Sequence, residues 1–265
     1  MEKKQVALVT GGSSGIGQAT ALALKEKGCI VYEISRRERP QPGIRHITAD
    51  VTLEETVTDA VAQVLKEQGR LDIVVNNAGF GISGAVEFTD LARAKRQFDV
   101  NFFGMVTVCK AVIPVMRAQG RGRIVNISSV AAPVAIPFQA FYSASKAAIN
   151  SFTCALQGEV RPFGITLCAV MPGDIATGFT AAREKEVQGD DVYAGRIARS
   201  VAKMEQDERG GMQPAIVGEL AARAATKKRV KPLYAVRFDY KAIVVLAKLL
   251  PASLLCRLVE LLYAD

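Results

Sequence analysis

Residues 6–17 read VALVTGGSSGIG, a short apolar run that leads directly into a turn rich in glycine and serine. The apolar residues do not alternate with polar ones, which is typical of a strand buried on both faces of a sheet. Residues 15–27 then have the pattern of a helix, which Gly28 ends. Glycines between a strand and a helix let the backbone approach a pyrophosphate closely, and the helix N-terminus favours its negative charge. The stretch therefore predicts the strand, turn and helix that open a dinucleotide-binding fold.

The same turn also fits a different site, the G-x-S-x-G nucleophile elbow of hydrolases, through Gly11, Ser13 and Gly15. That arrangement requires an acid and then a histidine further along the chain. His46 is the only histidine in the sequence, and it lies far too early for such a fold. The sequence therefore argues against a hydrolase.

Apolar, strand-like segments alternate with helical ones along most of the chain. This alternation implies crossover connections, which produce a parallel sheet covered by helices on both faces. We therefore predict an α/β fold, a doubly wound parallel sheet of the Rossmann type in a single domain over residues 1–265. Thr52 and Glu55 have the spacing of a capping box at one helix start. The expected strands are residues 5–10, 29–34, 71–76, 123–128, 165–170 and 232–236, and the expected helices are residues 15–27, 52–68, from about 90, 101–119 and from 142 onward.

Length and composition narrow the class of protein. With 265 residues and 49% hydrophobic content, the chain is an ordinary globular protein that can bury a substantial core. The opening residues lack a signal-peptide pattern, and the uncharged runs near the C-terminus are shorter than a membrane span needs. The five cysteines are scattered without a Cys-x-x-Cys pair, which indicates reduced thiols in a cytoplasmic protein, and we expect no metal site.

The net charge of +8 is concentrated in residues 220–238, which hold six basic residues and no acid. A basic patch can indicate nucleic acid or an anionic membrane surface. Between Arg223 and Arg237, however, Tyr234 is the only aromatic residue on which a base could stack. We expect a solvated surface and no nucleic-acid partner.

Two segments depart from the alternation of strands and helices. Residues 178–212 are charged and contain several glycines, and an insertion after a late strand lies at the C-terminal edge of the sheet. We expect this segment to be a substrate lid. Residues 238–265 form an apolar C-terminal extension of two short helices broken at Pro251. We expect the extension to pack on the lid as an apolar substrate wall; a weak peripheral contact with a membrane is the alternative.

Tyr142 and Lys146 are four residues apart in a segment with the pattern of a helix, so their side chains share one face. A phenol with its ordinary pKa of about 10 exchanges its proton poorly near neutral pH. A neighbouring ammonium favours the phenolate and lowers that pKa, which suits a tyrosine to general acid and base catalysis. Two solvated side chains on one helix face are the alternative, and the surrounding motifs decide between the two.

Five motifs coincide in order and spacing. They are the glycine turn at residues 10–17, Asn76-Asn77-Ala78-Gly79, Asn101, Ser129 and Tyr142-x-x-x-Lys146. Over about residues 5–177 this set resembles the classical short-chain dehydrogenase/reductase family. Residues 172–177 are similar to the family's segment beside the nicotinamide. A lid and an apolar tail of this kind resemble family members that act on hydroxysteroids and retinoids.

The resemblance implies a role for each residue of the catalytic set. Tyr142 would exchange the proton at the substrate oxygen, and Lys146 would lower its pKa and hold the nicotinamide ribose. Ser129 would hydrogen-bond the carbonyl. Its neighbour Ser128 is a rival, but adjacent residues of a strand face opposite sides, so only one can serve. Asn101 would anchor a water that links Lys146 to solvent, and its alternative role is a helix N-cap.

The resemblance also implies where a nicotinamide cofactor binds. Ser35 stands where relatives that prefer the unphosphorylated cofactor carry an acid, and Arg36 and Arg37 follow it. Adjacent guanidiniums suit a 2′-phosphate, so NADP(H) is expected, with two solvated loop arginines as the alternative. For Asp50 the alternative is a role at the start of the next helix. The other expected cofactor-binding residues are Gly11, Ser13, Ser14, Gly15, Ile16, Gly17, Asp50, Val51, Asn77, Gly79, Pro172, Gly173, Ile175 and Thr177, together with Tyr142 and Lys146.

From the resemblance we predict an NADPH-dependent oxidoreductase that interconverts a ketone or aldehyde and an alcohol. Its substrate would be hydrophobic, of the steroid, retinoid or lipid type, and the family's habit favours a homo-dimer or homo-tetramer. One alternative is a cofactor-binding regulatory protein without turnover, against which the retained Asn101, Ser129, Tyr142 and Lys146 argue. The other is a reductase of acyl thioester ketones.

Overall fold

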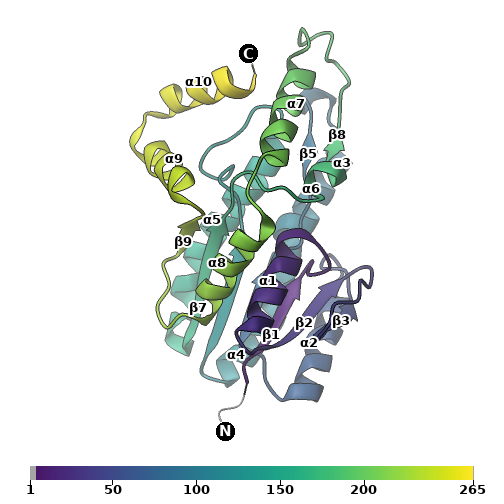
Figure 1. Cartoon of the computed structure of the whole chain (residues 1–265), viewed down its shortest axis with the longest axis vertical. Coiled ribbons are helices and arrows are strands. Elements are labelled where there is room, and N and C mark those ends of the chain that lie inside the picture. The colour runs from purple at the N-terminus through teal and green to yellow at the C-terminus, as the bar shows by residue number, and fades with distance from the viewer. Residues whose placement is uncertain (1–3, 265) are drawn as a thin grey trace.

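The computed structural model describes residues 4–264 and places a seven-stranded sheet at the centre of the chain (Figure 1). All strand pairs in this sheet are parallel, in the order β3-β2-β1-β4-β6-β7-β9. The strands are β1 Val6–Thr10, β2 Ile30–Ser35, β3 Ile44–Thr48, β4 Ile73–Asn76, β6 Gly122–Ile127, β7 Ile165–Met171 and β9 Leu233–Ala235. The helices that cover the sheet are α1 Gly15–Glu26, α2 Glu54–Gln68, α3 Leu91–Phe98, α4 Gly104–Ala118, α5 Ala140–Val160 and α8 Pro214–Thr226.

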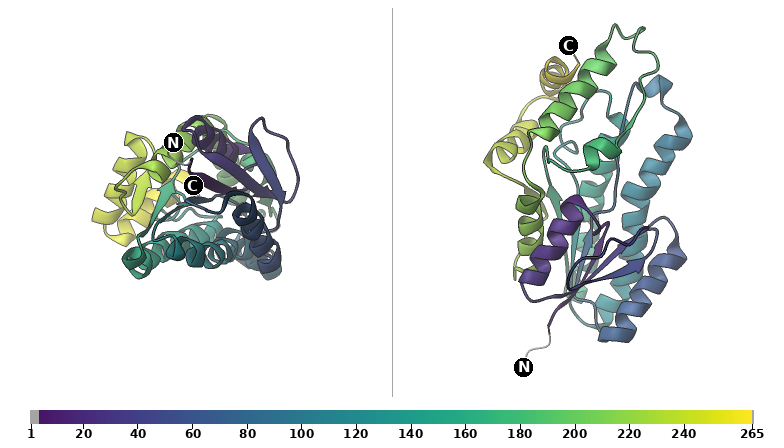
Figure 2. Two further views of the ribbon diagram at one scale, coloured as in Figure 1. Left: turned by 90° about the horizontal axis from the view of Figure 1, so that it is seen from below. Right: turned by 45° about the vertical axis from the view of Figure 1, so that its right-hand side comes forward.

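Helices pack on both faces of the sheet, as the two further views make clear (Figure 2). Neighbouring residues of β1 point into opposite layers. Leu8 belongs to the cluster that includes Val108 of α4 and Ile149 of α5, whereas Val9 belongs to the cluster that includes Leu24 of α1. Burial on both faces explains why β1 is apolar throughout. The predicted single-domain, doubly wound α/β fold is confirmed.

The direction in which strands are added to the sheet reverses between β1 and β4, which are neighbours. In such sheets the ligand crevice forms at this reversal, beyond the carboxyl ends of the strands. Here the turn after β1 is fastened to the loop after β4, because the Thr10 hydroxyl accepts hydrogen bonds from the backbone N–H of Asn77 (2.9 Å) and of Ala78 (3.0 Å).

Strand β3 and helix α8 are among the elements that were not expected. The edge strand β3 has polar residues at three of its five positions, and only Ile47 of its side chains is buried, so the sequence lacks a strand-like apolar run. Helix α8 occupies the start of the basic segment, where alanines such as Ala221 and Ala225 are buried against α1 and the sheet. The basic residues therefore do not form one continuous surface segment.

The expected capping box at Thr52 is wrong. Helix α2 begins at Glu54, its N-cap is Leu53, and no side chain caps it. The Thr52 hydroxyl instead donates to Asp50 Oδ1 (2.7 Å), because the chain turns at Asp50 before it enters the helix.

The expected helix start at Asn101 is also wrong. Helix α3 continues through a π-helical turn, Asp99–Phe103, directly into α4, so Asn101 lies inside one long helical run and cannot be an N-cap. This run, Leu91–Ala118, is long and apolar enough by length and composition to cross a membrane. It is a core helix here, because Val108 and Val112 are fully buried within the cluster that α4 forms with the sheet.

Residues 178–212 lie above the carboxyl ends of the strands (Figure 1). They form helix α6 Phe179–Ala182, the short strand β8 Glu184–Lys185 and helix α7 Arg196–Arg209. Strand β8 pairs in parallel with β5 Ile82–Ser83, which follows the loop after β4. The lid segment is thus attached by backbone hydrogen bonds to the edge of the crevice.

The C-terminal extension consists of α9 Phe238–Leu249 and α10 Ala252–Tyr263, which Pro251 separates as expected. The end of α10 packs on the lid, where Arg196 of α7 pairs with Glu260 and donates to the carbonyl oxygen of Ala264. Much of the remaining surface of the two helices is apolar and exposed.

Candidate active site

The structure brings the four expected catalytic residues together from three elements. Tyr142 and Lys146 share one face of α5, and Lys146 Nζ lies 5.6 Å from the centre of the Tyr142 ring. Ser129 follows directly after β6, and its hydroxyl lies near the Tyr142 phenol. Gly79 lies between Asn101 and Lys146. A Cβ added to Gly79 would be 3.0 Å from Asn101 Oδ1 and 3.7 Å from Lys146 Nζ.

The choice between Ser128 and Ser129 follows from their partners. The buried Ser128 hydroxyl donates to the backbone carbonyl of Lys146 (3.1 Å) and so fastens β6 to α5. The Ser129 hydroxyl lies near the Tyr142 phenol and accepts from the backbone N–H of Ala131 (3.0 Å). Ser129 is therefore the serine that can contact a substrate carbonyl.

Burial raises the pKa of Tyr142 to about 12. The nearby Ser129 hydroxyl and Arg183 guanidinium lower this pKa, whereas the Glu208 carboxylate raises it further. Burial has the largest effect on this pKa, and the expected lowering by Lys146 stays a prediction. A phenol in this environment stays protonated near neutral pH, which suits a proton donor.

Lys146 is buried, and burial lowers its pKa to about 8. Its Nζ donates to the carbonyl oxygen of Ile127 at 2.9 Å. Because this pKa remains above 7, the ammonium is the main form at neutral pH. A positive charge is thus held within reach of any phenolate that forms on Tyr142.

Asn101 is buried, and its side-chain amide is fully engaged. Oδ1 accepts from the backbone N–H of Phe80 (2.9 Å), while Nδ2 donates to the Phe80 carbonyl (3.0 Å) and to Ser145 Oγ (3.2 Å). Asn101 therefore fixes the loop after β4 against α5. Its expected contact with a water molecule stays a prediction.

The glycine turn has the geometry that a dinucleotide pyrophosphate needs. Gly11 and Gly15 have positive φ values of 63° and 55°. A Cβ on Gly17 would lie 2.2 Å from the Gly11 carbonyl oxygen, so only glycine fits there. Ser14 provides no side-chain cap to α1, which leaves the first N–H groups of the helix available to a phosphate. The residues present therefore fit the cofactor.

The loop after β4 supports this turn from behind. Asn77 Nδ2 donates to the carbonyls of Thr10 and Gly11, at 3.1 Å each. Asn77 thus holds the turn in shape, and its expected contact with the cofactor stays a prediction.

At the adenosine end, Arg36 and Arg37 are exposed, and within residues 4–264 neither guanidinium has an ion-pair partner. Asp50 accepts from the backbone N–H (2.9 Å) and hydroxyl of Thr52 in the turn before α2, and its expected contact with the adenine stays a prediction. Val51 is buried against α4, where a Cβ on Gly104 would come within 2.6 Å of it.

Sequence reasoning missed a buried polar cluster beneath the glycine turn. Glu33 of β2 is almost fully buried, and a Cβ on Gly12 would lie 2.5 Å from its Cβ. One carboxylate oxygen contacts His46 Nδ1, and the other has no hydrogen-bond partner among the described residues. The available signal was a glutamate in the otherwise apolar stretch IVYEIS.

Residues 172–177 cross the mouth of the crevice. The Pro172 carbonyl accepts from the backbone N–H of Val130 (2.8 Å), Ile175 is buried, and Thr177 lies 3.6 Å from the Cβ position of Gly15. Tyr240 of α9 packs over Gly173, whose Cβ position it would overlap. The segment therefore extends from the catalytic serine to the glycine turn, as a wall beside the nicotinamide must.

The lid covers Tyr142 directly, because the Phe179 ring lies against it with centroids 5.7 Å apart. The Arg183 guanidinium also lies over the Phe179 ring, 5.7 Å from its centre. Two surface hollows of about 450 and 480 Å³, one beside Lys4 and one beside Thr177, do not include Tyr142. Phe179 and Arg183 were not predicted, because their position depends on the path of the lid.

No group of three His, Cys, Asp or Glu side chains suited to a metal ion occurs in the part of the chain that the structure describes. The model of the short chain dehydrogenase family matches residues 5–188. The chain belongs to the short-chain dehydrogenases. The predicted family is thus confirmed. Members of this family are oxidoreductases whose fold binds a nicotinamide cofactor.

Several relatives of this short-chain dehydrogenase span nearly its whole length. The 3-ketodihydrosphingosine reductase of Bacteroides thetaiotaomicron is 44% identical over 243 residues, which cover 88% of this chain and 90% of the relative. A short-chain dehydrogenase from Streptomyces avermitilis has a similar structure, with a TM-score of 0.85 at 30% identity, covering 98% of this chain and 96% of the other. The 3-ketoacyl-(acyl-carrier-protein) reductase of Brucella melitensis, complexed with NADH, has a TM-score of 0.74 at 25% identity, covering 89% and 97%.

Proposed function

We propose that this short-chain dehydrogenase uses NADPH to reduce the ketone of a long-chain, lipid-like substrate. The observation that carries the proposal is the protonated Tyr142 phenol, which lies near the Ser129 hydroxyl and is backed by the Lys146 ammonium. A donor set of this kind suits reduction, in which a carbonyl oxygen must gain a proton. The name of the Bacteroides relative supports a sphingoid ketone, a long-chain molecule with a hydroxyl and an amino group beside its carbonyl.

Each residue of the site has a separate task. Bound NADPH would supply the hydride to the carbonyl carbon. The Ser129 hydroxyl would donate to the carbonyl oxygen and hold it beside Tyr142. The Tyr142 phenol would give its proton to that oxygen as the hydride arrives, so the ketone becomes a neutral alcohol. The Lys146 ammonium would stabilise the resulting phenolate until it is protonated again.

The proposed cofactor is NADP(H) rather than NAD(H). Arg36 and Arg37 follow β2, beside the adenosine end of the crevice, and neither has an ion-pair partner among residues 4–264. Ser35 supplies no carboxylate there that would repel a phosphate. Two available guanidiniums therefore favour a ligand with a 2′-phosphate.

We further propose that the C-terminal extension makes a weak peripheral contact with an anionic membrane, from which a lipid-like substrate would be drawn. Phe238, Leu249 and Leu262 are among the apolar residues that α9 and α10 expose. The acids of this region are paired, Asp239 with Arg237 and Glu260 with Arg196. The exposed charges without an ion-pair partner among the described residues are all basic, namely Lys241, Lys248 and Arg257.

The family's habit favours a homo-dimer or homo-tetramer in the cytoplasm as the working form. The five unpaired cysteines, three of them buried, suit a reducing compartment.

A substrate panel tests the proposed function. NADPH oxidation is followed with 3-ketodihydrosphingosine, a ketosteroid, retinal and a 3-ketoacyl thioester, and Tyr142→Phe serves as the inactive control. We expect the sphingoid ketone to have the highest kcat/KM. Preference for the thioester would instead identify an acyl thioester reductase. NADPH binding without turnover of any member would support the regulatory alternative and contradict the proposal.

A further inference from the structure

Arg183 is a buried guanidinium at the junction of α6 and β8 in the lid. Its side chain is only 1% exposed. Nη2 forms an ion pair with Glu208, but Nε and Nη1 have no hydrogen-bond partner among the described residues. Buried donors of a charged group are rarely left unpaired, because they lose their hydration without replacement. The described residues therefore provide no acceptor for these two nitrogens.

Arg183 lies close to the catalytic centre, beside the loop after β4. Its guanidinium lies 5.7 Å from the centre of the Phe179 ring, and that ring lies against Tyr142. Nε is 3.7 Å from the Cβ position of Gly81, in the loop that carries Gly79. The charge of Arg183 is close enough to Tyr142 to lower the pKa of the phenol. A molecule whose carbonyl contacts Tyr142 would thus place its neighbouring atoms near Arg183.

The charges around Arg183 limit which acceptor fits. Glu208 already neutralises the guanidinium and is itself held by the Thr180 hydroxyl, which donates to it at 2.6 Å. The Glu205 carboxylate is also nearby; the pKa of Glu205 is lowered mainly by Lys185, with a smaller contribution from Arg183. A carboxylate or phosphate bound here would be repelled by both acids. A neutral oxygen, such as a hydroxyl, can accept from Arg183 without that penalty.

We propose that Arg183 forms a head-group subsite in which Nε or Nη1 donates a hydrogen bond to a substrate hydroxyl close to the reacting carbonyl. This inference rests on the proposed function, since a sphingoid ketone carries such a hydroxyl. Glu208 positions the guanidinium, and its negative charge also suits the amino group of that head group. The subsite would distinguish head-group ketones from plain long-chain ketones.

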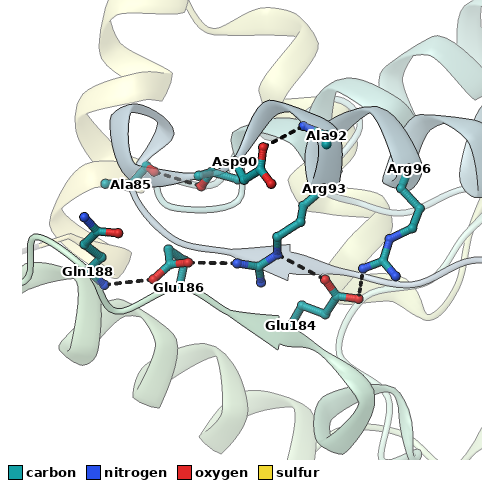
Figure 3. Close-up of polar contacts among 9 residues, drawn as sticks. Ala85, Asp90, Ala92, Arg93, Arg96, Glu184, Glu186 and Gln188 are labelled. Atoms are coloured by element: carbon teal, nitrogen blue, oxygen red, sulfur yellow. Dashed lines mark hydrogen bonds and ion pairs between the residues drawn. The ribbon is translucent and has the colours of Figure 1, made fainter.

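Other arginines of this region have a different task. Figure 3 shows Arg93 of α3 between Glu186, at 2.8 Å, and Glu184, at 3.3 Å, with Arg96 also paired to Glu184. These side chains fasten β8 to α3 at the outer edge of the lid and lie partly in solvent. Arg96 therefore provides a control for general effects of an arginine substitution on the lid.

The test compares two ketones that differ in one group, 3-ketodihydrosphingosine and its analogue without the hydroxyl. We measure kcat/KM for both with saturating NADPH in the wild type, Arg183→Lys and the control Arg96→Lys. Lysine keeps the charge and the pair with Glu208 but lacks the two unpaired donors. The double variant Arg183→Met/Glu208→Gln, which removes the ion pair as a unit, decides the matter if Arg183→Lys does not fold.

We expect the wild type and Arg96→Lys to prefer the hydroxylated ketone by roughly 10- to 100-fold, the effect of a hydrogen bond to a charged donor. In Arg183→Lys or the double variant the preference should fall to about threefold or less, with the KM for NADPH unchanged. If the variants lose kcat/KM equally with both ketones, Arg183 has a structural role and the subsite is overturned. A wild type that does not prefer the hydroxylated ketone would also overturn the subsite. Those outcomes leave the proposed function intact. A wild type that reduces neither ketone would overturn both.

Discussion

The Phe179 ring of the lid lies against the Tyr142 ring of α5, with their centroids 5.7 Å apart. The two residues come from separate parts of the chain, with β7 between their helices. This contact places the lid over the phenol and contributes to the burial that raises the pKa of Tyr142. Lid and catalytic helix therefore form one closed unit around the proposed proton donor.

Tyr142→Phe should abolish most activity without disturbing this unit. The substitution keeps the ring that packs against Phe179 and removes only the hydroxyl. Loss of a positioned proton donor should lower kcat by ~10²–10⁴-fold, while the affinity for NADPH stays within about twofold. Stopped-flow reduction and a fluorescence titration of NADPH measure the two quantities. Near-normal turnover in the variant would show that another group supplies the proton.

The burial of Lys146 leads to a prediction about how the stability of the folded protein depends on pH. Burial lowers the pKa of Lys146 to about 8 in the folded protein, below its ordinary value of 10.5. Between these two pH values the unfolded chain binds a proton that the folded protein has released, so stability rises with pH. Below pH 8 both states carry the proton, and the cost of burying the charge is present in full.

Lys146→Met removes this group, so the stability of the wild type relative to the variant should increase as the pH rises from about 8 to about 10.5. Urea unfolding of both proteins across that range measures the difference, and other titrating groups cancel between them. A difference that does not change with pH would mean that the Lys146 ammonium is not penalised by burial.

The comparison of sequence and structure shows which kinds of information are local. The apolar run of β1 and the four-residue spacing of Tyr142 and Lys146 are local patterns, and both were interpreted correctly. The edge strand β3 was missed because an edge strand with one exposed face does not need an apolar run. The π-helical turn at Asn101 depends on hydrogen bonds to Phe80, which sequence spacing does not reveal.

The lid contacts could not have been predicted at all. Phe179 and Arg183 belong to the lid segment, whose strand β8 pairs with β5, a connection between segments about a hundred residues apart. The pKa of Tyr142 was expected to respond mainly to Lys146, but burial under this lid has the larger effect.

Arg36→Ala tests the choice of cofactor. A charge-assisted hydrogen bond to the 2′-phosphate contributes roughly 1.5–3 kcal/mol, so its loss should reduce the preference for NADPH over NADH by ~10–100-fold. The exposed Arg39 in the same loop serves as the control, and Arg39→Ala should leave the preference unchanged. The ratio of kcat/KM values for the two cofactors is the measurement. Equal losses with NADPH and NADH would leave Arg36 as a solvated loop residue.

Substitution of two exposed leucines in the C-terminal extension tests the proposed membrane contact. Leu249 is 75% exposed and Leu262 is 62% exposed, so replacing both with serine should change the free energy of unfolding by no more than about 0.5 kcal/mol each. The wild type should sediment with vesicles that contain phosphatidylserine, and it should be released as salt screens Lys241 and Lys248. Leu249→Ser/Leu262→Ser should lose most of this binding.

The matched control is Leu91→Ser, which removes an equally exposed leucine from α3, away from the extension. It should bind vesicles as the wild type does, because the loss of one exposed leucine elsewhere does not alter the surface of α9 and α10. Reduction of a small soluble ketone should be the same in all three proteins, since none of the leucines belongs to the site. If the double variant binds vesicles as well as the wild type, the exposed leucines have another partner. A second copy of the chain would be the first to examine, because apolar helices that face neither lipid nor their own core are covered in most soluble proteins by a subunit contact.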